Sequence, residues 1–414
     1  MADESENEKM RSVDDHLALV LDTVQLLAPM ELPITDVNGL TLAADVVAAM
    51  PLPPFDNSSV DGYAVRLADL DGAAEDSPAE LRVVGDIAAG SVFEGILEPG
   101  TCARIMTGAM VPHGAEAIVP VEWTDGGTES VRITRVPERD EHVRVLGSDV
   151  ASGEVVLKAG TKLGPRQIGL LAAIGQVHAP VHPHPRVVVL STGSELVEPG
   201  TPLGPGQIND GNGPALTAAV NAMGATGIRV GIIGDEPQGV LNAIEDQLIR
   251  ADMVVTTGGV SVGAYDVVKE VLSTLGTVEF TKVAMQPGMP QGFGTVGEDR
   301  IPIFTLPGNP VSAYVSFELY IRPAIEKMMG REAGPRRTVT ATCFGAFSSP
   351  RGKRQFARGV YDAVGHSVRP VGGHGSHLVG DLALANALIV VPEHVTEVVD
   401  GDDVEVIVLD GGPR

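Results

Sequence analysis

The chain has 414 residues, more than one hydrophobic core normally holds, and we therefore expect two to four domains. Its formal net charge of -25 excludes a nucleic-acid partner, because binding to phosphates requires a basic face. The two cysteines form no CxxC pair, which argues against a zinc site or a disulfide framework. No run of about 18 apolar residues and no apolar signal segment occurs, so a cytoplasmic protein without a membrane span is predicted.

The chain is predicted to begin with an acidic leader and one helix. Residues 1–11 are expected to be disordered. Ser12 is a suitable N-cap, and Pro29 cannot continue a helix, so the helix is expected between them. Apolar residues recur there at helical spacing, at Val13, Leu17, Val20, Val24 and Leu27.

From about residue 30 to residue 150 the pattern changes to short β-type runs separated by glycine and proline. Three such runs are Leu81–Val84, Cys102–Met106 and Ala117–Val121. A second helix is expected from Pro165 to Ile174, with the proline in its first turn. We therefore predict two interleaved N-terminal domains, helical and β-rich, within residues 12–181.

Between residues 182 and 331 strand and helix signals alternate. The expected strands are Val187–Leu190, Ile228–Ile233, Met253–Thr257, Val278–Val283 and Ile301–Leu306. The expected helices are Gly213–Met223, Pro237–Ile249, Tyr265–Leu275 and Val311–Met329. This alternation indicates βαβ units in a parallel sheet that helices cover on both faces. The proline-rich segment from His178 to Pro185 is predicted to be a linker in front of this domain.

After Gly330 only short β-type runs are expected, without further helices. They are Thr338–Phe344, Gln355–Tyr361, Ser367–Pro370, Ala387–Val391 and Val404–Leu409. Residues 332–414 are therefore predicted to form a small β-domain, barrel-like or sandwich-like. The predicted fold class is α/β and multi-domain, with a parallel α/β domain, a mixed N-terminal region and this C-terminal β-domain.

The stretch Asp252–Asp266 carries the strongest local signal for a binding site. A β-branched run ends in Gly258 and Gly259, where the lack of a Cβ lets backbone N–H groups approach a ligand closely. If a helix follows, its N-terminal end favours an anion. Asp266 adds a carboxylate that an anion site tolerates only with a cation, so the stretch predicts an anion-plus-metal site.

Three acidic residues are predicted at one edge of the parallel sheet, because each follows a strand. They are Glu195, Asp235 and Asp266. Carboxylates that share an edge repel one another unless a hard cation such as Mg²⁺ binds between them. The alternative is that each acid only caps or begins a helix, where the helix dipole favours it.

Several motifs resemble those of the molybdopterin molybdenumtransferase (MoeA) family, to which the gephyrin E domain also belongs. In chain order they read FDNSSVDGYAV, ARIMTGAMVP, STGSEL, GQIND, TTGGVSVG, LPGNPVSA, FARG and GHGSH. The resemblance extends over nearly the whole chain after the acidic leader. It implies a four-domain fold with a MogA-like α/β domain at residues 182–331 and a C-terminal β-domain.

The resemblance also implies an activity. A family member inserts molybdate into adenylylated molybdopterin and releases AMP, requires Mg²⁺, acts as a homodimer and can work with a MogA-type adenylyltransferase. The matching positions with catalytic roles are Asp61, Thr107, Lys282 and Arg358. Those implied to bind substrate are Gly258, Gly259, Ser261, Gly308, Asn309 and Ser376, and those implied to bind the metal are Glu195, Asp235 and Asp266.

One segment departs from the family pattern, which often reads AxKPGKP. Here Gln286 and Met289 stand where lysines are frequent, and Lys282 remains. The loss of two cations weakens the expected oxyanion site, because charge-assisted hydrogen bonds are the strong ones. A tungstate-preferring homologue and a substrate-binding paralog with reduced turnover are therefore alternatives. Two functions of other classes also compete with the transferase: a non-catalytic molybdopterin-binding scaffold that retains the fold, and a nucleotide or pyrophosphate hydrolase built on the same MogA-like domain.

Overall fold

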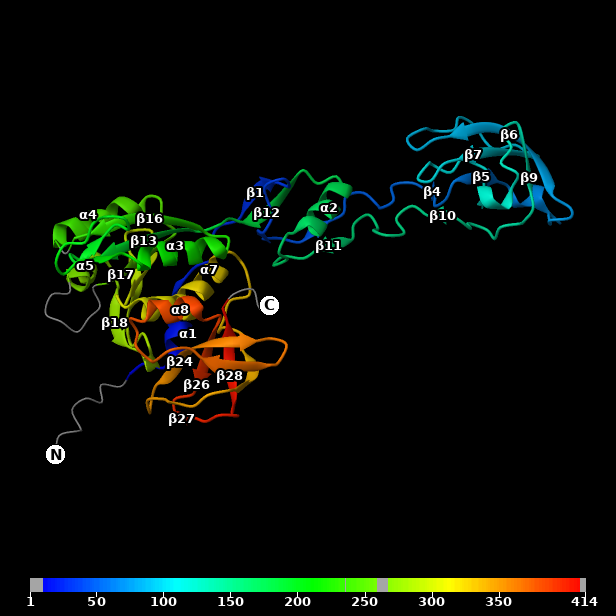
Figure 1. Ribbon diagram of the computed structural model, residues 1–414. Helices are drawn as coiled ribbons and strands as arrows, with labels where there is room; N and C mark the ends of the chain where they lie inside the picture. Colours follow the sequence, from blue (N-terminus) through cyan, green and yellow to red (C-terminus); the bar gives the residue numbers. More distant parts are fainter. Residues whose placement is uncertain (1–9, 235, 259–266, 410–414) are drawn as a thin grey trace. The chain divides into compact units, whose positions relative to one another are not determined.

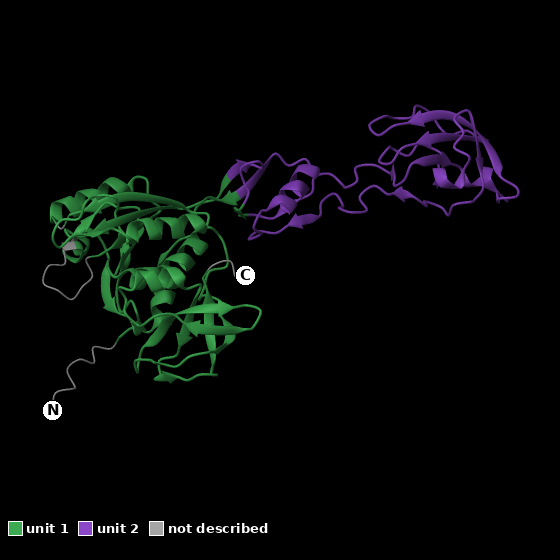
Figure 2. Cartoon of the chain, in the orientation of Figure 1, with its two compact units in different colours: residues 1–30, 39–43, 181–414 green, residues 31–38, 44–180 purple. Residues whose placement is uncertain are grey.

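The computed structural model describes residues 10–234, 236–258 and 267–409. The chain divides into two compact units, which Figure 2 shows in different colours. Unit 1 comprises residues 1–30, 39–43 and 181–414, and unit 2 comprises residues 31–38 and 44–180. The first helix, α1 (Val13–Thr23), therefore belongs to the same unit as the C-terminal half of the chain.

Unit 1 is built around a six-stranded sheet (Figure 1). Its strands, in spatial order, are β16 (Thr226–Ile233), β13 (Arg186–Thr192), β17 (Met253–Thr257), β21 (Ile301–Leu306), β20 (Pro290–Val296) and β18 (Glu279–Lys282). The first four strands are parallel, as predicted. The sheet also contains one strand that was not predicted, β20, which pairs antiparallel with both β21 and β18.

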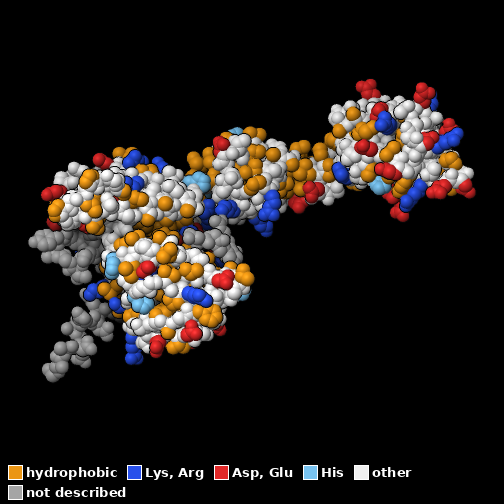
Figure 3. Space-filling view, viewed as in Figure 1, with side chains coloured by type: hydrophobic (Ala, Val, Ile, Leu, Met, Phe, Trp, Pro, Cys, Tyr) orange, Lys and Arg blue, Asp and Glu red, His pale blue; other side chains and the backbone are white. Residues whose placement is uncertain are grey.

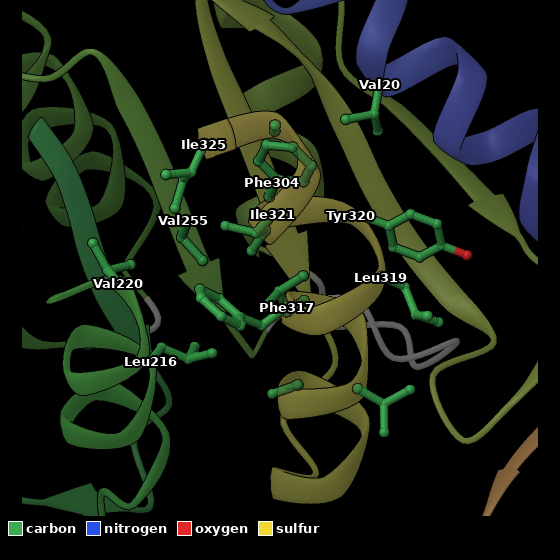
Figure 4. Close-up of a cluster of buried hydrophobic side chains, with 14 of the residues drawn as sticks. Val20, Leu216, Val220, Val255, Phe304, Phe317, Leu319, Tyr320, Ile321 and Ile325 are labelled. Atoms are coloured by element: carbon green, nitrogen blue, oxygen red, sulfur yellow. The ribbon is translucent and has the colours of Figure 1, made fainter. Parts of the chain in front are cut away.

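Both faces of this sheet are covered because its strands are apolar on both sides. In β13, Val187 and Val189 belong to one buried cluster, whereas Val188 and Leu190 belong to another. Such continuous apolar runs are typical of strands buried on both faces. The first cluster also contains side chains of helices α1, α3 (Asn212–Ala222), α6 (Pro310–Ser316) and α7 (Arg322–Met328), and of the π-helical turn η3 (Phe317–Ile321). Figure 4 shows part of this cluster. The second cluster contains side chains of α4 (Pro237–Leu248) and α5 (Val267–Leu275).

The C-terminal part of unit 1 is a closed barrel of five strands. They are β22 (Val339–Cys343), β24 (Arg354–Asp362), β25 (Ser367–Pro370), β26 (Ala387–Val391) and β28 (Asp403–Val408), with β24 pairing to β26 to close the ring. Strand β19 (Met285–Gln286) adds to β24, and the apolar Phe356, Leu388 and Ile407 lie in the same buried cluster as Phe304. The barrel therefore shares a core with the six-stranded sheet.

The expectation of no helix after Gly330 is wrong. Helix α8 (Val379–Leu384) follows the glycine-rich segment 372–375 and packs against α6 and β24. Its six residues are too few to show a repeating apolar pattern in the sequence. Further short strands of unit 1 outside the barrel include β14 (Leu196–Val197), β15 (Ile208–Asn209), β23 (Phe347–Ser348) and β27 (Glu397–Val398).

Unit 2 contains a five-stranded sheet and a smaller region. The sheet, in spatial order, has β8 (Ala117–Pro120), β5 (Gly62–Val65), β7 (Thr101–Ile105), β6 (Ala79–Ile87) and β9 (Ser130–Ile133), with the 3-10 turns η1 (Leu67–Leu70) and η2 (Val121–Trp123). The remaining elements are α2 (Pro165–Ala173) and the pairs β4 (Asn57–Ser58) with β10 (Val143–Arg144) and β3 (Val46–Val47) with β11 (Val155–Leu157). Acidic and basic side chains are interspersed over the visible face of the five-stranded sheet (Figure 3).

Two further expectations need correction. The segment predicted to be a linker forms strand β12 (His178–His182), which pairs with β1 (Met30–Pro33) and β2 (Thr41–Leu42). The residues of β12 that pair with β2 are Val181 and His182, which follow Pro180. Helix α1 ends at Thr23 rather than near Pro29, because Val24 already adopts an extended backbone. None of the helices within the described residues has the length and apolar character that crossing a membrane requires.

Candidate functional site

Two glycine turns meet at the carboxyl edge of the six-stranded sheet in unit 1. Strand β17 ends before Gly258, whose backbone N–H donates to the carbonyl oxygen of Leu306 at 3.1 Å. Gly258 has a φ of +96°, and a Cβ there would lie 2.4 Å from the carbonyl oxygen of Thr192, so only glycine fits. A Cβ at Gly308, after β21, would lie 3.7 Å from the Cα of Gly258. The two predicted turns therefore touch each other.

A buried carboxylate holds the neighbouring strand end. Asp210 has a side chain that is 1% exposed, and it accepts from the Ser191 hydroxyl and the Arg229 guanidinium, each at 2.8 Å. It also accepts from the backbone N–H of Gly213 at 3.0 Å, in the first turn of α3. One carboxylate thus ties β13, β16 and the start of α3 together. A buried acid is stable in such a place because several donors satisfy it.

Asn212, the first residue of α3, links both glycine turns. Its side-chain nitrogen donates to the Thr257 hydroxyl at 2.8 Å and to the carbonyl oxygen of Gly308 at 2.7 Å. Asn212 lies two residues after the end of the GQIND motif, at Asp210, and was not predicted. No local pattern could reveal it, because its partners lie 45 and 96 positions away in the chain.

Arg358 brings a barrel loop to this edge. Its side chain, on β24, is 5% exposed and donates from Nη1 to the carbonyl oxygen of Gly375 at 3.1 Å and from Nη2 to that of Gly373. Burial lowers the pKa of Arg358, against the opposing attraction of Asp381. The backbone carbonyl oxygen of the next loop residue, Ser376, accepts from the backbone N–H of Val311 at 3.0 Å, in the first turn of α6. The structure thus places Arg358 and Ser376 next to the turn that contains Gly308 and Asn309.

A small cavity of about 10 Å³ lies beside the Arg358 side chain, with room for about one water molecule. Residues that line it include Gln286, Gln355, Arg358 and His374. The Oε1 atom of Gln355 and the Nε atom of Arg358 are buried there without a hydrogen-bond partner. Gln286 and Arg358 therefore line the same cavity, whereas Met289 is not among the lining residues.

Lys282 lies at the same edge of the sheet. It ends β18, and β18 runs in the same direction as β21 because each pairs antiparallel with β20. The carboxyl end of β18 therefore lies at the same edge of the sheet as the carboxyl ends of β17 and β21. Lys282 is exposed.

Of the three predicted metal ligands, only Glu195 lies within the described residues. Glu195 lies in the turn after β13. Its carboxylate packs against the backbone of Gly193, so closely that a Cβ added to this glycine would lie 2.5 Å from a carboxylate oxygen. Asp235 and Asp266 lie outside the described residues, as do Gly259 and Ser261. Within the described ranges, no three His, Cys, Asp or Glu side chains lie close enough together to hold a metal ion.

The two remaining predicted residues, Asp61 and Thr107, form a hydrogen-bonded pair in unit 2. Oδ1 of Asp61 accepts from the backbone N–H and the hydroxyl of Thr107, each at 2.7 Å. The backbone donor and then the hydroxyl lower the pKa of Asp61 below its ordinary value. Asp61 is therefore a carboxylate that stays ionised and accessible.

Backbone contacts fix the turn that precedes Asp61. The N–H of Ser58 donates to the carbonyl oxygen of Ala109 at 3.0 Å, and the N–H of Gly108 donates to that of Ser58 at 2.8 Å. Ser59 donates to the carbonyl oxygen of His142 from its N–H at 2.9 Å and from its hydroxyl at 3.1 Å. The FDNSSVDGYAV and ARIMTGAMVP motifs are thus adjacent in space, which explains how they present Asp61 and Thr107 together.

Three family profiles match consecutive parts of the chain. They are the MoeA N-terminal region (domain I and II) at residues 11–175, a probable molybdopterin binding domain at residues 188–327 and the MoeA C-terminal region (domain IV) at residues 340–409. Together they span both units. The order of the three profiles along the chain matches the order of the motifs in the sequence.

Full-length relatives give the same result. The chain is 46% identical over 403 residues to molybdopterin molybdenumtransferase 2 of Mycobacterium tuberculosis, covering 96% of this chain and 99% of the relative. It is 39% identical over 422 residues to molybdopterin molybdenumtransferase 1 of the same organism, with coverage of 97% and 99%. A crystal structure of a molybdopterin biosynthesis MoeA protein from Pyrococcus horikosii superimposes with a TM-score of 0.86 at 33% identity, covering 97% of this chain and 100% of that one.

Proposed function

The chain belongs to the MoeA family, and from this premise we propose that it is a molybdopterin molybdenumtransferase, which inserts molybdate into adenylylated molybdopterin and releases AMP. The observation that carries the proposal is the assembly at the carboxyl edge of the six-stranded sheet. There the Arg358-bound loop adjoins the turn of Gly308 and Asn309, which touches the turn of Gly258. Ligands of open α/β sheets bind at such edges.

The chemistry of these groups suits an anionic pterin substrate. Glycine turns let backbone N–H groups approach a phosphate, and a guanidinium and an ammonium attract an oxyanion. In our proposal the turns of Gly258 and Gly308 bind the pterin phosphate, while Arg358 and Lys282 attract molybdate. The cavity beside Arg358 is smaller than a tetrahedral oxyanion, so we expect the loop at Gly373–Ser376 to move when molybdate binds.

We further propose that Mg²⁺ binds at Glu195, Asp235 and Asp266. Carboxylate oxygens are the ligands that this cation prefers, and it would neutralise charge on the phosphate bridge of the substrate. The accessible carboxylate Asp61, held by Thr107, would orient water or a hydroxyl group. A homodimer in the cytoplasm and a MogA-type adenylyltransferase as supplier of the substrate complete the proposal.

An AMP-release assay tests this function. The protein is incubated anaerobically with adenylylated molybdopterin and Mg²⁺, with and without molybdate, and AMP is quantified. We expect release that requires both molybdate and Mg²⁺. AMP release without molybdate would indicate a hydrolase, and the absence of release would indicate a scaffold that retains the fold.

A matched pair of variants locates the metal requirement. Asp266→Asn removes one negative charge at nearly constant shape, and we expect it to abolish most turnover at limiting Mg²⁺. Asp246→Asn makes the same change at an exposed position of α4 and should leave turnover unaltered. Normal turnover of Asp266→Asn at limiting Mg²⁺ would remove this residue from the metal site. The same assay with tungstate in place of molybdate measures the metal preference.

A further inference from the structure

We infer that Asn212 is a positioning residue, whose amide fastens the end of β17, at Thr257 and Gly258, to the turn of Gly308 after β21, so that these two strand ends form one surface for molybdopterin. The inference rests on the proposed function, because it concerns the same sheet edge. It adds a residue that lies in none of the motifs from which the function was predicted.

The two hydrogens of one amide nitrogen serve two different strand ends. One donates to the hydroxyl of Thr257, the last residue of β17, which is 2% exposed. The other donates to the backbone carbonyl of Gly308, two residues after the end of β21. The ladder between these strands ends at Thr257 and Leu306, and one further backbone hydrogen bond runs from the N–H of Gly258 to the carbonyl oxygen of Leu306. Asn212 adds a side-chain link that extends to Gly308, two residues beyond Leu306.

The amide itself is delivered from a fixed frame. Asn212 is the first residue of α3, and the next residue, Gly213, donates its N–H to the buried Asp210 carboxylate at 3.0 Å. Asp210 is fixed in turn by Ser191 and Arg229. A Cβ at Gly213 would lie 2.5 Å from that carboxylate, so this close approach requires glycine. The start of α3 therefore cannot shift without breaking several buried contacts.

The effect of Asn212 is expected in ligand affinity more than in stability. Both amide hydrogens bond to the protein, so Asn212 acts through the turns rather than through its own contact with the ligand. Pre-organised binding groups lose affinity when their support is removed, and a displacement of about 1 Å can cost about a hundredfold. Asn212→Ala should therefore weaken molybdopterin binding by about tenfold or more.

The same helix provides a matched control. Asn221, near the other end of α3, accepts from the Gly227 backbone N–H at 2.8 Å through its side-chain oxygen. Asn221→Ala deletes an equivalent side chain and one hydrogen bond away from the carboxyl edge. It should lower the melting temperature by an amount similar to Asn212→Ala while molybdopterin affinity stays at the wild-type value.

The experiment is anaerobic equilibrium dialysis of molybdopterin against the full-length wild type, Asn212→Ala, Asn221→Ala, Thr257→Val and Asn212→Ala/Thr257→Val. Thr257→Val removes the hydroxyl that accepts from Asn212, so the two single substitutions delete the same hydrogen bond. The loss of molybdopterin binding free energy in the double variant should therefore be smaller than the sum of the losses in the two single variants. Wild-type affinity in folded Asn212→Ala, or additive losses in the double variant, would overturn the inference alone. A wild type that does not bind molybdopterin would overturn the proposed function together with it.

Discussion

The carboxyl edge of the six-stranded sheet in unit 1 and the Asp61 turn in unit 2 hold their polar groups by different means. At the sheet edge, Asp210 and Arg358 are buried and bond to groups from several distant segments. Asp61, by contrast, is exposed and bonds to one neighbouring turn through Thr107. In the buried region a polar side chain supports the fold and the site together, whereas in the exposed region it can serve the chemistry with little consequence for the fold.

The largest expected effect is a loss of stability when the buried carboxylate Asp210 is removed. Asp210→Ala leaves the Arg229 guanidinium, the Ser191 hydroxyl and the Gly213 N–H without their shared acceptor. Removing one partner from a buried ion pair lowers the unfolding free energy by about 3 kcal/mol or more. Urea denaturation of the full-length wild type and of Asp210→Ala would measure this loss.

The control for Asp210→Ala uses the second acid that contacts Arg229. Glu198 lies 2.9 Å from this guanidinium but its side chain is 48% exposed. Exposed pairs contribute only about 0–1 kcal/mol, so Glu198→Ala should change stability little. Equal losses in the two variants would show that burial does not govern this network.

An intermediate effect is expected at the cavity beside Arg358. Gln286→Lys introduces a second cation into the cavity that Arg358 lines. One charge-assisted hydrogen bond is worth about 1.5–3 kcal/mol before desolvation costs. The variant should therefore lower the molybdate concentration for half-maximal AMP release by about tenfold. Without molybdate the two like charges repel, so the variant should melt at a lower temperature than the wild type.

Gln238→Lys is the control, because it adds the same charge at an exposed position on α4. It should leave the molybdate dependence unchanged. If Gln286→Lys behaves in the same way with its fold intact, Gln286 does not contact the oxyanion, even though it lines the cavity.

The smallest effect is expected at Asp61. Thr107→Val removes the donor hydroxyl and retains the backbone donor, so the pKa of Asp61 should rise part of the way back towards its ordinary value. A lowered pKa stabilises the fold above the unfolded-state pKa, and this contribution disappears as the pH falls through the folded-state pKa. In Thr107→Val this contribution should be smaller and its loss complete at a higher pH than in the wild type. Carbon NMR titration of the Asp61 carboxyl group measures the raised folded-state pKa.

Thr124→Val serves as the control for Thr107→Val in the same unit. The Thr124 hydroxyl donates to the carbonyl oxygen of Val121 and has no hydrogen bond to Asp61 among the described contacts. It should leave the Asp61 titration where the wild type has it. An unshifted titration in Thr107→Val would mean that the backbone N–H alone sets the pKa.

Elements with strong local patterns could be predicted from the sequence. The run of β-branched residues from Met253 to Thr257 forms β17 with the predicted bounds, because it is buried on both faces and ends at a glycine. Strand β20 was missed, since its glycines hide the strand pattern. A Cβ at Gly294 would lie 2.4 Å from the carbonyl oxygen of Thr277, so a tertiary contact, which no sequence window contains, requires glycine there.

The candidate site divides in a similar way. The meeting of the turns at Gly258 and Gly308 could be predicted, because strand direction places both at one edge of the sheet. The acids predicted at that edge stay a prediction, since Asp235 and Asp266 lie outside the described residues. The hydrogen bonds from Arg358 to the carbonyl oxygens of Gly373 and Gly375 could not be predicted, because the resemblance implied only a catalytic role for this residue. Asn212 was also unpredictable, since its role depends on where two other strands end.

The pairing of β19 with β24 has a consequence for how unit 1 comes apart. Because β24 bonds to a strand outside the barrel and Phe356 packs in the same core as Phe304, the barrel is an integral layer of the unit rather than an appendage. Proteolytic cleavage between α7 and β22 should therefore leave two fragments that remain associated and co-migrate on gel filtration. Amide hydrogens at the centre of β24 should exchange with solvent only when the whole unit unfolds cooperatively.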